Sequence, residues 1–281
     1  MKKYVKLSIS VVFLLFLIWL GIGFYISRYS LKLTEYKISS DKISAPLRIV
    51  QIADLHCTDH GKALTELIAE QKPDLITIVG DLVNMDEEDI STALTTLRNL
   101  VPIAPVYVSL GNHEAVHRDT FPNDLIQSFT DTGAIVMDNI YEDIQVKGQR
   151  FRIGGIYGYC LPDNVVEARK PDSAFLYEYQ DTTQFKLLLA HMPVCWLIND
   201  SLDYWDVDCV LSGHSHGGQV VLPFIGGLYA PDQGWFPERI DGHFEHDNKH
   251  LIVTSGLGGT DPVPRFYNRP EVVVLDILPS I

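Results

Sequence analysis

Basic residues are scarce in this chain of 281 residues. It has 22 lysines and arginines against 36 aspartates and glutamates, which gives a formal net charge of −14. An acidic surface of this kind repels a phosphate backbone, so we expect no binding to a nucleic-acid duplex. An anionic substrate would have to be attracted by a local positive charge, which bound metal ions can supply.

Cysteine is also scarce, and its spacing carries little information. No two of the four cysteines form a C-x-x-C pair, which leaves neither a thiolate zinc motif nor a dense disulfide framework. We interpret them as small buried apolar side chains that do not indicate the redox compartment. They are Cys57, Cys160, Cys195 and Cys209.

Charged residues are absent from residues 7–27, which are flanked by Lys6 and Arg28. A helix rises about 1.5 Å per residue, so this run is long enough to cross a hydrocarbon layer of about 30 Å. A cleaved signal peptide is the alternative, but the run lacks an A-x-A pattern. We therefore expect an uncleaved, single-pass anchor that binds the cell membrane through residues 7–27.

The orientation of this anchor is poorly marked, because lysines and arginines before and after the run are nearly balanced. A very short basic tail usually stays in the cytoplasm, which favours an extracytoplasmic position for the rest of the chain. The sequence does not decide between the two sides.

The chain divides into three parts. We expect a short basic tail with a transmembrane helix at residues 1–27, a polar linker at 28–46 and a globular domain at 47–281. In the first half of that domain, strand-like and helix-like stretches alternate, which is typical of neighbouring parallel strands. The second half is rich in strands. Strands are expected at 47–53, 75–79, 105–110, 185–190, 208–212, 219–222, 251–255 and 272–277, helices at 61–71, 88–100 and 122–131, and long loops at 157–184 and 222–242.

Five short polar runs lie within a few residues of expected strand ends. Because ligands bind at the carboxyl edge of α/β sheets, we expect the side chains of these runs to converge. Their aspartate, histidine and asparagine side chains suit Mn²⁺, Fe²⁺ or Zn²⁺, and the absence of thiolate argues against a structural zinc site. The runs are Asp54–His56, Gly80–Asn84, Gly111–Glu114, Ala190–His191 and Gly213–His216.

In order and spacing, these runs (D-x-H, G-D-x-x-N, G-N-H-E, a lone His and G-H-x-H) resemble the calcineurin-like metallophosphoesterases. The resemblance covers residues 47–281. The anchor, the G-H-x-H-G-G-Q run at 213–219 and the tail at 256–271 resemble the bacterial membrane-associated phosphodiesterase branch. The implied fold class is α/β, a four-layer β sandwich flanked by helices, here preceded by a transmembrane helix.

The resemblance also implies two divalent cations that share one bridging carboxylate, that of Asp81. Cations about 3.5–4 Å apart can clamp phosphoryl oxygens and lower the pKa of bound water toward about 7. They would also leave a net positive site inside an acidic protein. Three further ligands would belong to each cation: Asp54, His56 and His216 to the first, and Asn112, His191 and His214 to the second.

His113 is the histidine of the G-N-H-E run that is not a ligand, and the resemblance implies a catalytic role. It would protonate the leaving oxygen or stabilise charge on the phosphoryl group. Where the family often has aspartate, this chain has Asn84, which can orient the His113 ring but adds no charge. Asn84 is also a candidate substrate contact.

Two arginines, Arg265 and Arg269, lie in a proline-rich loop and are further candidates for substrate binding. A guanidinium there could bind a second phosphate, and a surface ion pair is the alternative. Four aromatic residues of the loop at 222–242 could line an apolar groove for lipid tails or simply pack on the sandwich. They are Phe224, Tyr229, Trp235 and Phe236.

Together these features predict a metal-dependent phosphoesterase, a membrane-anchored hydrolase with a dinuclear site. We expect it to cleave a phosphodiester or pyrophosphate bond in a lipid or envelope precursor, by in-line attack of a metal-bridging hydroxide. A phosphomonoesterase or protein phosphatase is the enzymatic alternative. A non-catalytic metal-binding scaffold is disfavoured because the ligands and His113 are all present.

Overall fold

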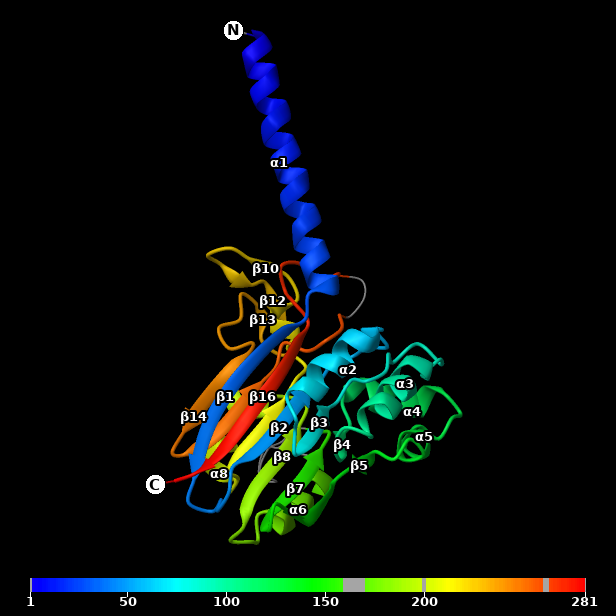
Figure 1. The fold of residues 1–281 in the computed structure, drawn as a ribbon, viewed down its shortest axis with the longest axis vertical. Coiled ribbons are helices and arrows are strands. Elements are labelled where there is room, and N and C mark those ends of the chain that lie inside the picture. Colours follow the sequence, from blue (N-terminus) through cyan, green and yellow to red (C-terminus); the bar gives the residue numbers. More distant parts are fainter. Residues whose placement is uncertain (1, 159–169, 199–200, 260–262, 281) are drawn as a thin grey trace.

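The computed structural model describes residues 2–158, 170–198, 201–259 and 263–280. Within these ranges the long strands form two six-stranded sheets that pack face to face (Figure 1). The first sheet has the order β1 (Lys32–Ser40), β16 (Glu271–Pro279), β2 (Leu47–Ile52), β3 (Leu75–Val79), β4 (Val106–Ser109) and β5 (Ile135–Met137). The second has the order β14 (Gly242–His246), β15 (Lys249–Val253), β9 (Cys209–Ser212), β8 (Phe185–Ala190), β7 (Gln149–Ile156) and β6 (Ile140–Val146).

Helices cover the outer face of each sheet, which completes four layers and confirms the expected fold class. The first sheet is covered by α2 (Gly61–Glu70), α3 (Ser91–Leu100) and α5 (Leu125–Thr130). The second is covered by α6 (Lys170–Tyr179), α7 (Val194–Ile198) and α8 (Ser201–Tyr204). A further helix, α4 (Asn112–Thr120), begins directly after β4.

The central strands are apolar throughout because both of their faces are covered. Strands β2, β3, β4 and β5 are mutually parallel, and every residue of β3 is buried. Such two-sided burial produces continuous apolar runs rather than strict alternation. Ile49 of the first sheet and Leu187 and Leu211 of the second belong to the core between the sheets.

The prediction of a linker at residues 28–46 is wrong for most of that range. Residues 32–40 form β1, which pairs in parallel with β16 over the whole length of both strands. The signal is a period-two pattern: Ile38 is buried and Tyr36 is partly buried, while Glu35 and Lys37 are exposed. At the edge of a sheet such a half-polar strand is favourable, because its outer face stays in water.

Further elements depart from the expectations, among them a hairpin and a helix. Strands β6 and β7, which were not expected, form a hairpin whose turn has positive φ at Lys147 and Gly148. That pair of conformations is typical of a tight two-residue hairpin turn. Helix α6 lies inside the loop expected at 157–184, of which residues 159–169 lie outside the described residues.

Helix α1 (Lys2–Tyr29) projects from the sandwich (Figure 1). Its Ser8–Tyr29 portion is long and apolar enough to cross a membrane. The base of the helix is fixed by the loop before β16: Phe266 packs edge-on against Trp19 and Phe24 with ring centroids 5.1 and 5.0 Å apart. Asn268 N donates to Ser27 Oγ at 3.0 Å, which ties the last turn of the helix to the same loop.

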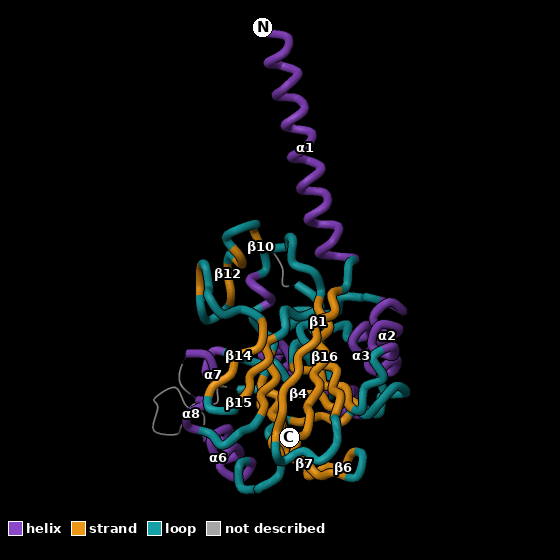
Figure 2. The backbone as a smooth tube through the Cα atoms, turned by 60° about the vertical axis from the view of Figure 1, so that its left-hand side comes forward, coloured by secondary structure: helices purple, strands orange, loops and turns teal. Residues whose placement is uncertain are grey.

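Four short strands form two small hairpins between β9 and β14. They are β10 (Val221–Leu222) with β11 (Gly226–Gly227), and β12 (Tyr229–Ala230) with β13 (Gly234–Trp235). Figures 1 and 2 both place these hairpins at the end of the sandwich from which α1 projects.

Replacement of Leu187 by alanine tests the core between the sheets. Leu187 is fully buried, and truncation of such a side chain removes apolar contacts and leaves a cavity, so we expect a loss of about 2–5 kcal/mol. Ile140→Ala, at a half-exposed position of β6, should cost less than about 0.5 kcal/mol. The measurement is chemical denaturation of the full chain in detergent micelles. Equal midpoints for the two variants would contradict the assigned core.

Candidate metal centre

The five polar runs meet at one edge of the two sheets. Asp54 and His56 follow β2, Asp81 follows β3, and Asn112 begins α4 after β4. Of the other three histidines, His191 follows β8, and His214 and His216 follow β9. Two groups of side chains each bring their ligand atoms within 4.8 Å of one another. One group is Asp54, His56 and His216, and the other is Asp81, His191 and His214.

Backbone strain is concentrated at these positions. Positive φ angles are uncommon for residues other than glycine, and they persist where the surroundings enforce them, often at functional sites. Five of the seven candidate ligands have this conformation: Asp54, His56, Asp81, His214 and His216.

Two glycines allow the ligands to approach one another. Gly80 has φ +75°, and a Cβ atom there would overlap with the His191 ring. A Cβ atom on Gly111 would overlap with the Asp81 carboxylate. The glycines that open two of the runs are therefore required by close packing around Asp81.

Asp81 lies at the centre of the cluster. Its Oδ2 atom is 3.1 Å from His191 Nε2 and 3.7 Å from His56 Nε2. His191 Nε2 is also 3.9 Å from Oδ1 of Asp54, and His216 Nε2 is 3.9 Å from the same atom. One carboxylate thus lies between histidines of both groups, as a shared ligand would.

The protonation states fit cation binding. Burial lowers the pKa of His56 to about 3 and that of His216 well below its usual value, which leaves one nitrogen of each ring with a free lone pair at neutral pH. Burial acts in the same direction on His191, but the carboxylates of Asp81 and Asp54 outweigh it and raise that pKa to about 10. Without a bound metal ion, the two carboxylates therefore stabilise a second proton on the His191 ring, and metal binding would displace that proton.

Unpartnered buried atoms provide an independent test of the fit. Buried polar atoms are normally hydrogen-bonded, yet His56 Nδ1 and Nε2, Asn112 Oδ1 and His216 Nδ1 have no hydrogen-bond partner among the described residues. His191 Nδ1 lies 2.8 Å from the Val79 carbonyl and keeps its proton there, so the proton that metal binding would displace is the one on Nε2, which then becomes a ligand atom. Imidazole, carboxylate and amide donors suit divalent cations, so the residues present fit the metals that the sequence predicts.

Glu114 organises the centre, although no role was expected for it from the sequence. Its carboxylate accepts hydrogen bonds from the backbone N–H groups of Asp81 (2.8 Å), Leu82 (2.7 Å), Val83 (3.2 Å) and Gly111 (2.7 Å). These bonds join the loop after β3 to the start of α4. The available signal was its position three residues after Gly111, where glutamate often caps a helix.

His113 is oriented by the backbone rather than by Asn84. Met85 N donates to His113 Nδ1 at 3.2 Å, while His113 Nε2 lies 4.0 Å from Asp81 Oδ2. The side chain of Asn84 instead donates to Glu87 at 2.8 Å and to the His56 carbonyl at 3.4 Å. The expected contact between Asn84 and the His113 ring is therefore replaced by a main-chain donor, which a sequence pattern does not reveal.

The two candidate arginines donate hydrogen bonds to backbone carbonyl oxygens of neighbouring loops. Arg265 is buried, and its guanidinium donates to carbonyl oxygens that include those of Ser255 and Gly258, both at 2.7 Å. Arg269 donates to the carbonyls of Ser30 (3.0 Å) and Leu31 (2.6 Å), just beyond α1. Contact of either side chain with a substrate phosphate stays a prediction.

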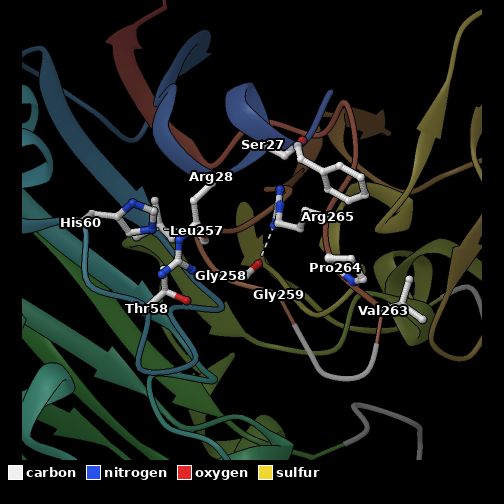
Figure 3. A pocket seen from close by; sticks show the side chains of 11 residues that line it. Ser27, Arg28, Thr58, His60, Leu257, Gly258, Gly259, Val263, Pro264 and Arg265 are labelled. Carbon is white, nitrogen blue, oxygen red and sulfur yellow. Dashed lines mark hydrogen bonds between the residues drawn. The ribbon is translucent and has the colours of Figure 1, made fainter. Parts of the chain in front are cut away.

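A cleft of about 300 Å³ lies between the base of α1 and the loop at residues 53–60, which carries Asp54 and His56 and is called the first ligand loop (Figure 3). Arg28 from the end of α1, Thr58 and His60 from that loop, and Arg265 line it. His60 Nε2 lies 3.2 Å from the carbonyl of Leu257. The base of the apolar helix and the loop that carries Asp54 and His56 therefore border the same cleft.

Buried carboxylate, imidazole and amide ligands at the strand ends of a four-layer α/β sandwich define a metal-dependent phosphoesterase, a hydrolase. Residues 47–218 match the family model of the calcineurin-like phosphoesterases, and the chain belongs to that family.

Relatives of this chain extend across bacteria. The uncharacterized metallophosphoesterase Cj0846 of Campylobacter jejuni is 29% identical over 95% of this chain and 68% of its own length. The uncharacterized metallophosphoesterase YkuE of Bacillus subtilis is 28% identical, with 92% of this chain and 89% of that protein covered. The phosphodiesterase YaeI of Escherichia coli is 30% identical, with 84% and 83% covered.

Replacement of Glu114 tests its organising role. Glu114→Ala removes all four acceptor bonds, so the ligand loops lose their alignment and we expect metal affinity to fall about 10- to 100-fold. Glu114→Gln keeps an acceptor oxygen and should lose less. Competition with a metallochromic chelator measures the affinity, with Glu66→Gln on the exposed face of α2 as the matched control. Wild-type affinity in Glu114→Ala would show that the loops hold their places without this carboxylate.

Proposed function

We propose that this protein is a membrane-anchored phosphodiesterase that uses two divalent cations to cleave a phosphodiester or pyrophosphate bond in a lipid or envelope precursor. The observation that carries the proposal is the position of Asp81 between the two groups of ligands, 3.1 Å from His191 and 3.7 Å from His56. A single carboxylate in this position suits a pair of cations better than one cation alone.

The seven candidate ligands would hold the two cations as the sequence predicts, with Asp81 shared between them. Bound there, divalent cations supply Lewis acidity toward phosphoryl oxygens and make a coordinated water more acidic. Mn²⁺, Fe²⁺ and Zn²⁺ all suit these ligands. The chain itself supplies the geometry, because strained backbones and the Glu114 bonds fix the ligands before any cation binds.

His113 would act on the substrate as a hydrogen-bond donor. Burial lowers its pKa, so the ring is neutral at neutral pH. Since Nδ1 accepts from Met85 N, the single ring proton lies on Nε2, on the side that faces Asp81. A neutral imidazole is a poor general acid, so stabilisation of charge on the phosphoryl oxygens is the role that this geometry favours.

A diester substrate is supported by the name of the Escherichia coli relative, a phosphodiesterase at 30% identity. A phosphomonoesterase is the alternative, and comparison of the two ester types decides between them. A membrane substrate is supported by the apolar portion of α1 and by the cleft that Arg28 shares with the first ligand loop. An extracytoplasmic site stays a prediction from the short basic tail.

Removal and replacement of metal test the proposal directly. Chelator-treated full-length protein should not hydrolyse bis(p-nitrophenyl) phosphate, and Mn²⁺ should restore activity. Because Asp81 would serve both cations, Asp81→Asn should lower kcat/KM by about a thousandfold. The diester should be preferred over p-nitrophenyl phosphate. Preference for the monoester would refute the phosphodiesterase assignment, and metal-independent turnover would refute the site.

The His113→Asn variant distinguishes the two possible roles of this histidine. If it donates to phosphoryl oxygens, kcat should fall by about a hundredfold on both activated and alkyl diesters. A general acid is needed only for a poor leaving group, so its loss would slow the alkyl diester far more than the nitrophenyl diester. The ratio of the two losses is the measurement, and a loss confined to the alkyl diester would contradict the donor role.

A further inference from the structure

Four large apolar side chains are exposed on or next to the two small hairpins β10–β11 and β12–β13. Phe224 is fully exposed, and Ile225, Trp235 and Phe236 are 59%, 71% and 63% exposed. Single exposed apolar residues are ordinary, but several on one protruding segment indicate a surface that meets another apolar phase. We call these four residues the apolar rim.

The backbone gives the same indication. Phe224 has φ +67° and Phe236 has φ +55°, a conformation that bulky residues rarely adopt. Neither strain nor exposure of an aromatic ring stabilises the free protein. Local features that oppose stability in this way are commonly retained where a segment has a binding role.

The position of the apolar rim beside α1 indicates that the apolar environment it meets is a lipid bilayer. In both Figure 1 and Figure 2 the hairpins lie at the end of the sandwich from which α1 projects. Helix α1 is exposed along its apolar length and fits a bilayer, so a bilayer that contains α1 would lie over this end of the domain. Tryptophan and other aromatic side chains are favoured at the membrane–water interface.

One groove is lined both by Trp235 of the apolar rim and by the metal-ligand candidate His216. Its volume is about 470 Å³, which is within the range of pockets that hold small molecules. The metal-ligand candidate His216 is one of its lining residues, together with Val220, Leu228 and Trp235. Among the described residues that line it, none is an aspartate, glutamate, lysine or arginine. An apolar groove whose lining includes a metal-ligand candidate suits a molecule with a phosphate head and a hydrocarbon tail.

We infer that the groove binds an acyl chain of a membrane lipid whose phosphate lies at the metal centre, and that the apolar rim rests in the bilayer to receive that chain. This inference rests on the proposed phosphodiesterase function and specifies its substrate class. The chain leaves the bilayer along apolar side chains, so its hydrocarbon need not cross open water.

Chain-length selectivity tests the groove. The full-length protein with Mn²⁺ is assayed in one type of non-ionic micelle with p-nitrophenyl hexadecyl phosphate and p-nitrophenyl methyl phosphate, which share the same scissile bond. The ratio of their kcat/KM values is compared between the wild type, Val220→Trp and Ile140→Trp. Val220→Trp fills the groove and should lower the long-to-short ratio by about tenfold, because buried methylenes lose their contacts. Ile140→Trp, on the far sheet edge, should keep the wild-type ratio although both substrates partition into the same micelles.

The outcomes separate the two proposals. An unchanged ratio in a Val220→Trp protein that binds Mn²⁺ as the wild type does would overturn the acyl groove and leave the phosphodiesterase function standing. Failure of the wild type to hydrolyse either diester would overturn the function, and the inference with it. Leu228→Ala, which widens the groove without filling it, should also lower the ratio and guards against misfolding of the tryptophan variant.

Quenching by brominated lipid tests the rim. Phe224→Trp and Ile140→Trp each add one exposed tryptophan to the full-length protein, which is reconstituted in phosphatidylcholine vesicles with and without dibrominated phosphatidylcholine. The emission added by Phe224→Trp should be quenched, and that added by Ile140→Trp should not. Equal quenching of the two, or burial of the indole added by Phe224→Trp in a dimer contact without quenching, would overturn the bilayer position of the rim.

Discussion

The structure of the site depends on one buried carboxylate, that of Asp81. It lies within 4 Å of histidines that come from different sheets, His56 after β2 and His191 after β8. A buried charge is costly unless it is surrounded by partners, and here the histidines outweigh burial and hold the pKa of Asp81 well below its usual range. The close approach of Gly80 and Gly111 and the bonds of Glu114 follow from the need to fix this group.

The metal centre could be predicted because each ligand run carries its own sequence signal at a strand end, and because the runs share one order. Glu114 and the partner of His113 could not be assigned in this way. Glu114 acts on four backbone N–H groups, and Met85 acts through its own N–H, so neither contact depends on a recognisable pair of side chains. Asn84, the one departure from the commoner pattern, is used to tie its own loop to Glu87.

The large layers of the fold were also predictable, whereas its edges were not. Central strands such as β3 are continuous apolar runs, and their burial on both faces leaves few alternatives. The edge strand β1 alternates apolar and charged residues and was mistaken for a linker, since a half-polar strand differs from a loop only in its period. The β6–β7 hairpin depends on the Lys147–Gly148 turn, whose positive φ angles are visible only in the structure.

An acidic protein can bind a phosphate substrate if the attraction is confined to the metal centre. Arg265, one of two candidates for binding a second phosphate, is buried and donates to carbonyl oxygens, so attraction of phosphate would depend mainly on the bound cations. Attraction by cations is local and does not require a basic surface. If the substrate is the proposed lipid, apolar contacts would retain it, and an acidic protein can provide these without opposing its net charge. An apolar rim beside α1 therefore complements a site whose electrostatics act only at short range.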